Sequence, residues 1–255
     1  MNVNMSRRTL IAGLAAGSVT ACVTNPDTGE SQFLLVSDGQ LSQMAASAWS
    51  DAKKQTPVSR DPALNNQLQR IGGRIVTAAN RQNDSWEYAV FDSDQKNAFV
   101  MPGGKVGFYR GIMEFSDNDD QIAAIMGHET GHVTGRHAAA RFSTQIAAGA
   151  GLTAANIALS RTDTRYKNKI AAILGAGVSF GVILPFSRRH ELQADRLGVD
   201  YMHRAGYDVH QSVKLWEKMA AESTGSGQPE FLSTHPSPET RVRELDSYIR
   251  AKGYG

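Results

Sequence analysis

Two histidines and a glutamate stand at a spacing that suits a metal-dependent hydrolase. In the segment HETGH, His128 and His132 are four residues apart, and Glu129 follows the first of them. On a helix, residues four apart lie about 40° apart around the axis, so both imidazoles would face one point, as two ligands of a tetrahedral zinc must. Glu129 would lie about 100° further round, where it could reach a water molecule without binding the metal. The pattern predicts two metal ligands and a general base.

A third protein ligand is needed, and the same segment does not supply it. In the metzincin pattern a glycine and then a histidine follow downstream; Gly135 stands at the glycine position, but Ala138 occupies the histidine position. His137 is one residue short. The helix is also expected to continue through Phe142, whereas the pattern requires a sharp turn. We therefore exclude the metzincin arrangement and predict that His137 is an ordinary surface or capping histidine.

A second helix offers carboxylates at the same spacing. Residues 187–202 predict a helix that starts at Ser187, with Glu191 and Asp195 on one side of it. One carboxylate could bind the metal while the other accepts the free N–H of a ligand imidazole. Ala194 and Gly198 on that side would allow the first helix to approach closely. On an exposed helix the two like charges would only repel each other, so a shared metal site explains the pair better.

Three further stretches extend the pattern: NAFVMPGG at 97–104, PFSR at 185–188 and STHPS at 233–237. Together with HETGH and the ELQAD segment at 191–195, they resemble the gluzincin metallopeptidases of family 48, which include HtpX, the CAAX prenyl proteases and small periplasmic lipoprotein peptidases. The resemblance covers residues 38–249. The chain lacks the long membrane helices of HtpX, which favours the lipoprotein branch.

The resemblance implies one zinc ion per chain, with His128, His132 and Glu191 as its ligands. It also implies that Glu129 is the general base and that Asp195 contacts a ligand rather than the metal. In such a site Glu129 takes a proton from the attacking water and later passes it to the departing amine.

Two further expectations follow from the resemblance. His235 would lie near the metal and help to stabilise the oxyanion; the alternative is a loop histidine that precedes a helix. Arg241 could order the loop that carries His235. A strand edge would pair with the extended backbone of a substrate, and its residues are Asn97, Ala98, Phe99 and Val100.

The elements that must position these residues predict an α+β, mostly helical fold of the zincin-like type. Apolar spacing predicts helices over 41–54 and 62–79. Residues 86–111 are rich in β-branched and aromatic side chains and contain a turn at 102–104, which predicts a hairpin of strands 98–101 and 106–109. We expect a small antiparallel sheet beside the histidine helix, and mostly helix after residue 119.

Size and composition fit a single globular domain with appendages. The chain has 255 residues, of which 41% are hydrophobic and 20% charged, enough for a sizeable core. The formal net charge of +2 comes from Arg7 and Arg8, so the chain from Cys22 onward is formally neutral. No cluster of basic residues indicates a nucleic-acid partner.

The N-terminus has the features of an export signal. Residues 1–21 contain Arg7 and Arg8 followed by a short apolar stretch, and they end in small residues before Cys22, the only cysteine. This resembles the lipobox of bacterial lipoproteins, in which the cysteine is acylated and becomes the new N-terminus. The arginine pair also resembles a twin-arginine export motif, although such pairs occur in ordinary signals. We expect residues 22–37 to be a lipidated tether and 38–255 the metallopeptidase domain.

One apolar segment requires its own interpretation. Residues 170–186 carry no charge, but the segment contains three glycines and is shorter than a typical membrane helix. We expect a buried or interfacial helix beside the active site, with membrane contact as the alternative.

The sequence as a whole predicts a zinc metalloendopeptidase of the bacterial cell envelope that cleaves misfolded or misassembled proteins. Val23 rather than Asp follows Cys22, which by resemblance to lipoprotein sorting predicts the periplasmic side of the outer membrane; an inner-membrane lipoprotein and a soluble periplasmic protein are the alternatives. A chaperone-like assembly factor that retains the fold but rarely cleaves is the competing function. The intact HETGH motif favours the enzyme, since a scaffold has no need of Glu129.

Overall fold

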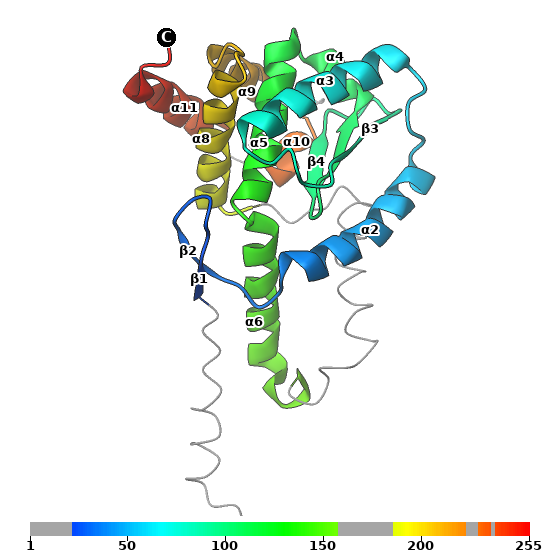
Figure 1. Ribbon diagram of the computed structural model, residues 1–255, viewed down its shortest axis with the longest axis vertical. Helices are drawn as coiled ribbons and strands as arrows, with labels where there is room; N and C mark the ends of the chain where they lie inside the picture. The colour runs from blue at the N-terminus through cyan, green and yellow to red at the C-terminus, as the bar shows by residue number, and fades with distance from the viewer. Residues whose placement is uncertain (1–21, 158–185, 223–228, 236–237) are drawn as a thin grey trace, which may run out of the picture.

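The computed structural model of the protein describes residues 22–157, 186–222, 229–235 and 238–255 (Figure 1). Its helices are α2 (Asp38–Gln55), α3 (Pro62–Ala78), α4 (Arg110–Phe115), α5 (Asp119–Thr134), α6 (His137–Ile157), α8 (Arg188–Arg204), α9 (His210–Glu222), α10 (Phe231–Thr234) and α11 (Pro238–Lys252). Its strands are β1 (Cys22–Thr24), β2 (Ser31–Phe33), β3 (Glu87–Phe91), β4 (Ala98–Met101) and β5 (Lys105–Tyr109). The predicted α+β, mostly helical class is confirmed.

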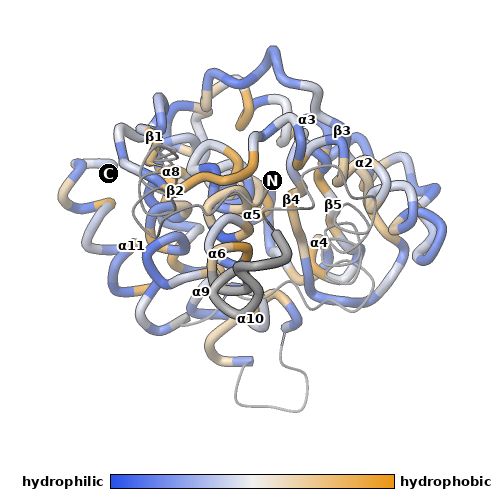
Figure 2. The backbone as a smooth tube through the Cα atoms, turned by 90° about the horizontal axis from the view of Figure 1, so that it is seen from below, coloured by the Kyte–Doolittle hydropathy of each residue, from blue (hydrophilic) through white to orange (hydrophobic). Residues whose placement is uncertain are grey.

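Helix α5, which carries the HETGH segment, is the central element. It packs against α3, α8, α9 and β4, and its residues are buried on nearly every side, as in a core helix. At its N-terminus the Asn118 side chain accepts a hydrogen bond from the backbone N–H of Gln121, and Asp119 and Asp120 favour this positive end of the helix dipole. Figure 2 shows hydrophobic residues gathered toward the interior and hydrophilic residues along much of the outer helix α11.

Helices α5 and α8 approach each other through small residues. A Cβ atom added to Gly131 would lie 2.6 Å from the carbonyl oxygen of Ala194, and one added to Gly198 would lie 2.8 Å from the backbone nitrogen of His128. Any larger side chain at these positions would therefore separate the two helices. The predicted close approach at Ala194 and Gly198 is confirmed.

The three-stranded sheet has the order β3-β5-β4. The predicted hairpin is present, because β4 and β5 pair antiparallel and Gly103 and Gly104 adopt the positive φ angles that the tight turn requires. The small antiparallel sheet that we expected is found only in part, since β3 pairs with β5 in parallel. The chain enters β4 at the sheet edge and returns through β5 beside β3, so β3 and β5 run in the same direction.

The α5 helix does not continue through Phe142 as expected. It ends at Thr134, and Arg136 adopts a left-handed conformation with φ 52° before α6 begins at His137. The break redirects the chain, and α6 extends away from the body of the molecule (Figure 1).

Residues 22–37, which we expected to form a tether, include two paired strands. Strands β1 and β2 form an antiparallel hairpin that lies at the C-terminal end of α5 (Figure 1). The buried side chains of Asn25 and Gln32 donate hydrogen bonds to the backbone carbonyls of Thr134 and Gly135. These carbonyls have no partner within their own helix, so the hairpin satisfies hydrogen-bonding groups that the end of α5 leaves free.

The remaining helices follow the sequence closely. The predicted helices over 41–54 and 62–79 are α2 and α3, and Ser187 caps α8 by accepting a hydrogen bond from the backbone of His190. The segment 1–21 lies outside the described residues, as do residues 170–185 of the apolar segment. Within the described part of the chain, no helix combines the length and apolar character needed to cross a membrane.

Candidate metal centre

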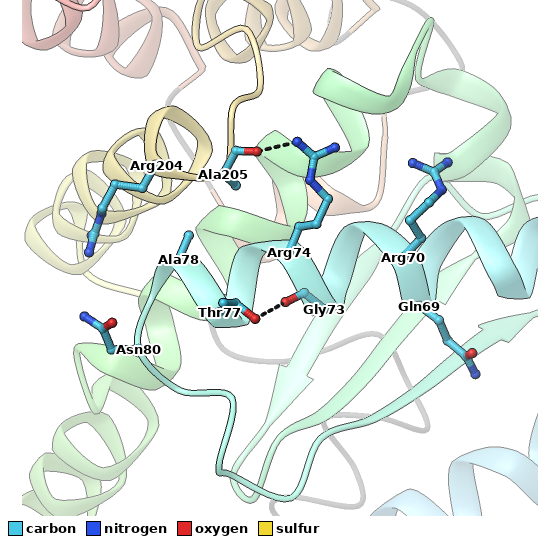
Figure 3. Close-up of a pocket in the computed structure, with 9 residues that line it drawn as sticks. All are labelled: Gln69, Arg70, Gly73, Arg74, Thr77, Ala78, Asn80, Arg204 and Ala205. Atoms are coloured by element: carbon cyan, nitrogen blue, oxygen red, sulfur yellow. Dashed lines mark hydrogen bonds between the residues drawn. The ribbon is translucent and has the colours of Figure 1, made fainter.

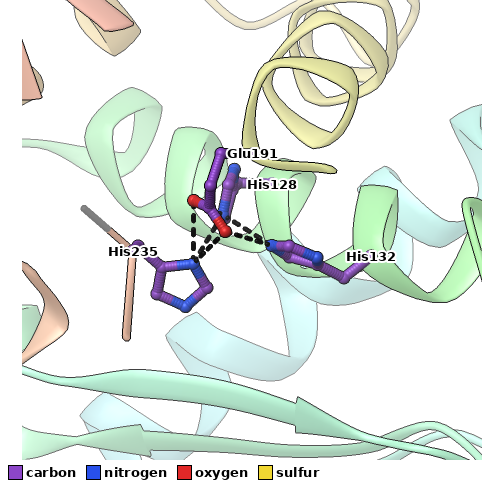
Figure 4. Close-up of side chains that lie close together, drawn as sticks. All are labelled: His128, His132, Glu191 and His235. Atoms are coloured by element: carbon purple, nitrogen blue, oxygen red, sulfur yellow. Dashed lines mark hydrogen bonds and ion pairs between the residues drawn. The ribbon is translucent and has the colours of Figure 1, made fainter. Parts of the chain in front are cut away.

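Helices α5 and α8 bring three potential metal ligands together (Figure 4). The Nε2 atoms of His128 and His132 lie 3.0 Å apart. Each of these atoms lies 3.5 Å from a carboxylate oxygen of Glu191. All three side chains are almost completely buried, so the donors face one another rather than solvent.

His235 joins these residues from the end of α10. Its Nδ1 atom lies 3.1 Å from Nε2 of His128 and 3.1 Å from Oε2 of Glu191. The ring stacks on Phe231 with centroids 4.3 Å apart. Among the described residues this is the one group of histidines and carboxylates whose donor atoms all lie within 4.8 Å of one another.

The donor set fits zinc. A tetrahedral ion with bonds of about 2.1 Å requires its ligand atoms to be about 3.4 Å apart, and the donor atoms of His128, His132 and Glu191 lie 3.0 to 3.5 Å apart. Burial lowers the pKa of His128 to about 4 and that of His132 well below its usual value, which keeps both imidazoles neutral. Burial alone would raise the pKa of Glu191, but positive charge from His235 and Arg241 outweighs it and lowers the pKa. The residues are thus in the protonation states that zinc ligands need.

Asp195 contacts a histidine rather than the group of donors itself. Its Oδ1 lies 2.9 Å from Nδ1 of His128. Because Nε2 of His128 faces the other donors, its proton belongs on Nδ1, which donates to Asp195. Asp195 therefore lies where a residue that orients His128 should lie.

Arg241, from α11, has a larger part than the sequence indicated. The side chain is 1% exposed. It donates hydrogen bonds to Glu191 over 2.9 Å and to Asp195 through both Nε and Nη2. Its guanidinium carbon lies 3.4 Å from the centroid of the Trp216 ring. Nη2 also lies 2.8 Å from Nδ1 of His128. Because this Nδ1 carries a proton and cannot accept a hydrogen bond, Nη2 donates to Asp195. Burial alone would raise the pKa of Asp195, yet the charge and hydrogen bonds of Arg241, with His128, hold it at about 2. One buried cation thus pairs with two buried carboxylates.

His137 is not the surface or capping histidine that we predicted. It is fully buried, and its Nδ1 lies 2.9 Å from Nδ1 of His132. Its Nε2 lies 2.7 Å from Oε1 of Gln193 on α8. Burial lowers the pKa of His137 to about 3, so the ring is neutral.

Glu129 lies beside the donors without joining them. The carboxylate is 2% exposed, and its Oε1 has no hydrogen-bond partner among the described residues; Nε2 of His235 lies 3.4 Å away. Burial raises the pKa of Glu129 to about 7. A group with such a pKa can take up and return a proton at neutral pH.

The predicted substrate strand lies next to Glu129. Strand β4 is one of the two edge strands of the three-stranded sheet, and the backbone of Val100 hydrogen-bonds Glu129. Asn97, Ala98 and Phe99 are buried, and Phe99 packs on Trp49. These residues can therefore offer a substrate their backbone rather than their side chains.

A separate surface hollow of about 830 Å³ lies between α3 and the end of α8 (Figure 3). Its volume is that of an ordinary ligand site, but its lining contains no histidine or carboxylate, and its charged residues are Arg70, Arg74 and Arg204. Because this lining offers no metal ligand and no general base, we do not assign the hollow to catalysis.

Two substitutions on α8 separate a metal ligand from a residue that orients one. We expect Glu191→Gln to abolish stoichiometric zinc, and Asp195→Asn to weaken zinc affinity by about 10–100-fold, because only the orientation of His128 is lost. Competition with chelators of graded strength measures both. Asp200→Asn, the same change further along α8, is the matched control and should bind zinc normally. Equal losses in the Glu191 and Asp195 variants would place Asp195 on the metal and contradict the assignment.

Comparison with known proteins agrees with this geometry. The model of peptidase family M48 matches residues 62–249. The beta-barrel assembly-enhancing protease of Escherichia coli is 32% identical over 248 residues, which cover 92% of this chain and 50% of that protein. The mitochondrial metalloendopeptidase OMA1 of Schizosaccharomyces pombe is 34% identical over 185 residues, which cover 71% of this chain and 52% of that protein. The chain thus spans about half the length of these curated relatives.

Proposed function

The chain belongs to peptidase family M48, a family of zinc-dependent metallopeptidases, and on that basis we propose that it is a zinc endopeptidase of the bacterial cell envelope. The observation that carries the proposal is the buried group of His128, His132, Glu191 and His235 with Glu129 beside it. Glu129 has the raised pKa and the unpartnered oxygen that a general base requires.

The proposed roles follow from this arrangement. His128, His132 and Glu191 hold zinc, which when bound lowers the pKa of a water molecule to about 7 and polarises a carbonyl group. Glu129 accepts a proton from the attacking water and later donates it to the departing amine. His235, whose Nε2 points toward Glu129, stabilises negative charge that develops on the scissile carbonyl oxygen. Asp195 and Arg241 hold the ligands in place.

The edge strand β4 is our candidate for substrate binding. An extended peptide that pairs with Asn97, Ala98, Phe99 and Val100 would lie alongside Glu129, since Val100 already contacts this carboxylate through its backbone. Pairing of this kind reads the backbone rather than the side chains, which suits unfolded substrates of varied sequence. We therefore propose misfolded or misassembled envelope proteins as substrates. The name of the E. coli relative, an assembly-enhancing protease, agrees with this class.

An assembly factor with little proteolysis is the alternative. Such a protein would need the fold, but it would have no use for a buried carboxylate with a pKa near 7. Burying an ionisable group without a hydrogen bond to one oxygen is unfavourable, and Glu129 is retained in that environment. This favours the enzyme.

A protease assay tests the proposed function. The protein purified with its metal should cleave an unfolded protein such as labelled casein, lose this activity in a zinc chelator, and recover it when zinc is added back. A folded, cleavage-resistant protein serves as the control substrate. Activity that survives full removal of the metal, or a zinc-loaded protein that does not cleave, would contradict the proposal.

We further propose that Cys22 is lipidated and holds the protein at the periplasmic side of the outer membrane. The cysteine is exposed at the start of β1, so an acyl chain would not disturb the core. Cys22→Ala should release the protein into the soluble periplasmic fraction, whereas Val23→Asp should leave it lipidated but retained in the inner membrane. Fractionation on a density gradient measures both. A Cys22→Ala protein that stays with the membrane would show that another segment is the anchor.

A further inference from the structure

We propose that His137 is a positioning residue for zinc: together with Gln193 it fixes which nitrogen of His132 carries the proton, and thereby which nitrogen faces the metal. The inference rests on the proposed zinc site. It assigns a role to a histidine outside the HETGH motif and outside the four grouped donors.

The positions of the protons follow from the distances. Nε2 of His132 faces the other donors, so its lone pair must be free and its proton must lie on Nδ1. Nδ1 of His132 is 2.9 Å from Nδ1 of His137, and two nitrogens at this distance need one donor and one acceptor. His132 is therefore the donor, and His137 accepts.

The amide oxygen of Gln193 favours one tautomer of His137. With Nδ1 as the acceptor, the proton of His137 lies on Nε2, which is 2.7 Å from Oε1 of Gln193 and donates to it. In the opposite arrangement Nδ1 of His137 would donate to His132 and leave Nε2 unprotonated against the amide oxygen, so the Gln193 amide would have to turn from the orientation seen here and present its NH2 group. That arrangement would also put a proton on Nε2 of His132, where it would block the metal. The amide oxygen thus favours the state that binds zinc.

The local backbone is shaped to place this ring. The left-handed Arg136 ends α5 and turns His137 back toward His132. Gly135 leaves the space, because a Cβ atom there would lie 2.2 Å from Nε2 of His137. His190 stacks on the other side of the ring, with centroids 4.3 Å apart and planes inclined by 13°. The hydrogen bonds to His132 and Gln193, rather than this stacking, fix the direction of the two ring nitrogens of His137.

Charge explains why this partner is a histidine. His128 already has a carboxylate partner, and Arg241 pairs with both Asp195 and Glu191. A second orienting carboxylate beside His132 would add a third buried negative charge to the site. A neutral ring supplies the acceptor without that charge.

Zinc affinity tests the inference, with His137→Leu, His137→Asn and His190→Leu compared with the wild-type protein. Leu removes the acceptor from His132, whereas the Asn oxygen can replace Nδ1 as an acceptor. We expect zinc affinity, measured by chelator competition, to fall by about 10–100-fold in His137→Leu and to stay within about threefold in His137→Asn. His190→Leu is the matched control, because it removes a ring from the same stack but no partner of a ligand, and should bind zinc like the wild type.

The visible absorption of the cobalt(II)-substituted proteins gives a second readout that does not depend on catalysis. The bands should shift in His137→Leu, because His132 is free to turn, and stay unchanged in His190→Leu. Should His137→Leu not fold, Gln193→Leu tests the same chain of hydrogen bonds, and we expect zinc affinity about 3–10-fold below that of Gln193→Glu, which keeps an acceptor.

Three results would overturn the inference: wild-type affinity in His137→Leu, an equal loss in His137→Asn, or an equal loss in His190→Leu. If His137→Leu does not fold, equal affinities of the two Gln193 variants would do so as well. These results leave the proposed function standing, provided the wild-type protein binds zinc. A wild-type protein without zinc affinity would overturn the proposed function and this inference together.

Discussion

Glu129→Gln is expected to keep stoichiometric zinc and the native fold while proteolysis of an unfolded substrate falls by about 10²–10⁴-fold, the range for loss of general acid–base catalysis. Gln has nearly the same shape as Glu but cannot take up a proton at neutral pH. The wild-type carboxylate can, because burial raises the pKa of Glu129 to about 7. Initial rates on labelled casein and zinc per chain by metal analysis measure the two halves of the prediction.

Zinc retention is the half that discriminates. Glu129 contacts the backbone of Val100 and lies 3.4 Å from His235, but it is not one of the four grouped donors. Loss of zinc together with activity would make it a ligand. Near wild-type cleavage with zinc bound would refute the mechanism and favour the assembly factor. Glu244→Gln, the same change at an exposed ion pair on α11, is the control and should alter neither quantity.

Arg241→Met should destabilise the metal-free protein by about 3–5 kcal/mol, the usual effect of removing one partner from a buried ion pair. Met can fill much of the volume above Trp216, but it leaves the carboxylates of Asp195 and Glu191 buried without their cation. The free energy of unfolding of Arg241→Lys should lie between those of the wild type and Arg241→Met. Lysine keeps the charge but lacks the planar guanidinium group that binds both carboxylates. Urea unfolding of the metal-free proteins gives the free energies.

An exposed arginine on α8 provides the control for this prediction. The Arg189 side chain is 73% exposed and pairs with Glu30, so Arg189→Met should change the free energy of unfolding by less than about 1 kcal/mol. A change of that small size in Arg241→Met would mean that the two carboxylates do not depend on Arg241 for their charge balance.

The part of the site that could be predicted from sequence depends on local periodicity. His128 and His132, and likewise Glu191 and Asp195, are four residues apart on helices that the structure confirms. The small residues that bring these helices together were also visible, because they lie on the same face as the carboxylates. The β4–β5 hairpin was predicted for a similar reason, since its turn residues lie between its strands.

The other features of the site and the sheet depend on contacts between segments that the spacing of residues in the sequence does not reveal. Residues five apart on a continuous helix lie about 140° apart, so His137 could not have reached His132 unless α5 ended, and a left-handed arginine is an uncommon way to end it. Gly135, which caps the C-terminus of α5, is the one feature of the sequence that indicates this break. Arg241 depends on how α11 packs on α8, and arginine is rarely buried without partners. The parallel pairing of β3 with β5 likewise depends on strand order.

The docked hairpin at residues 22–33 determines how far the active site can reach from a bilayer. A flexible linker of about 15 residues would let the domain range over roughly 20 Å. Cys22 instead begins a strand paired with Phe33, and the hairpin is fastened to the end of α5 by Asn25 and Gln32. If Cys22 is acylated as proposed, the hairpin leaves little free chain between the lipid and the domain, so the active site stays close to the lipid headgroups. Substrates would then have to come to the membrane surface to be cut.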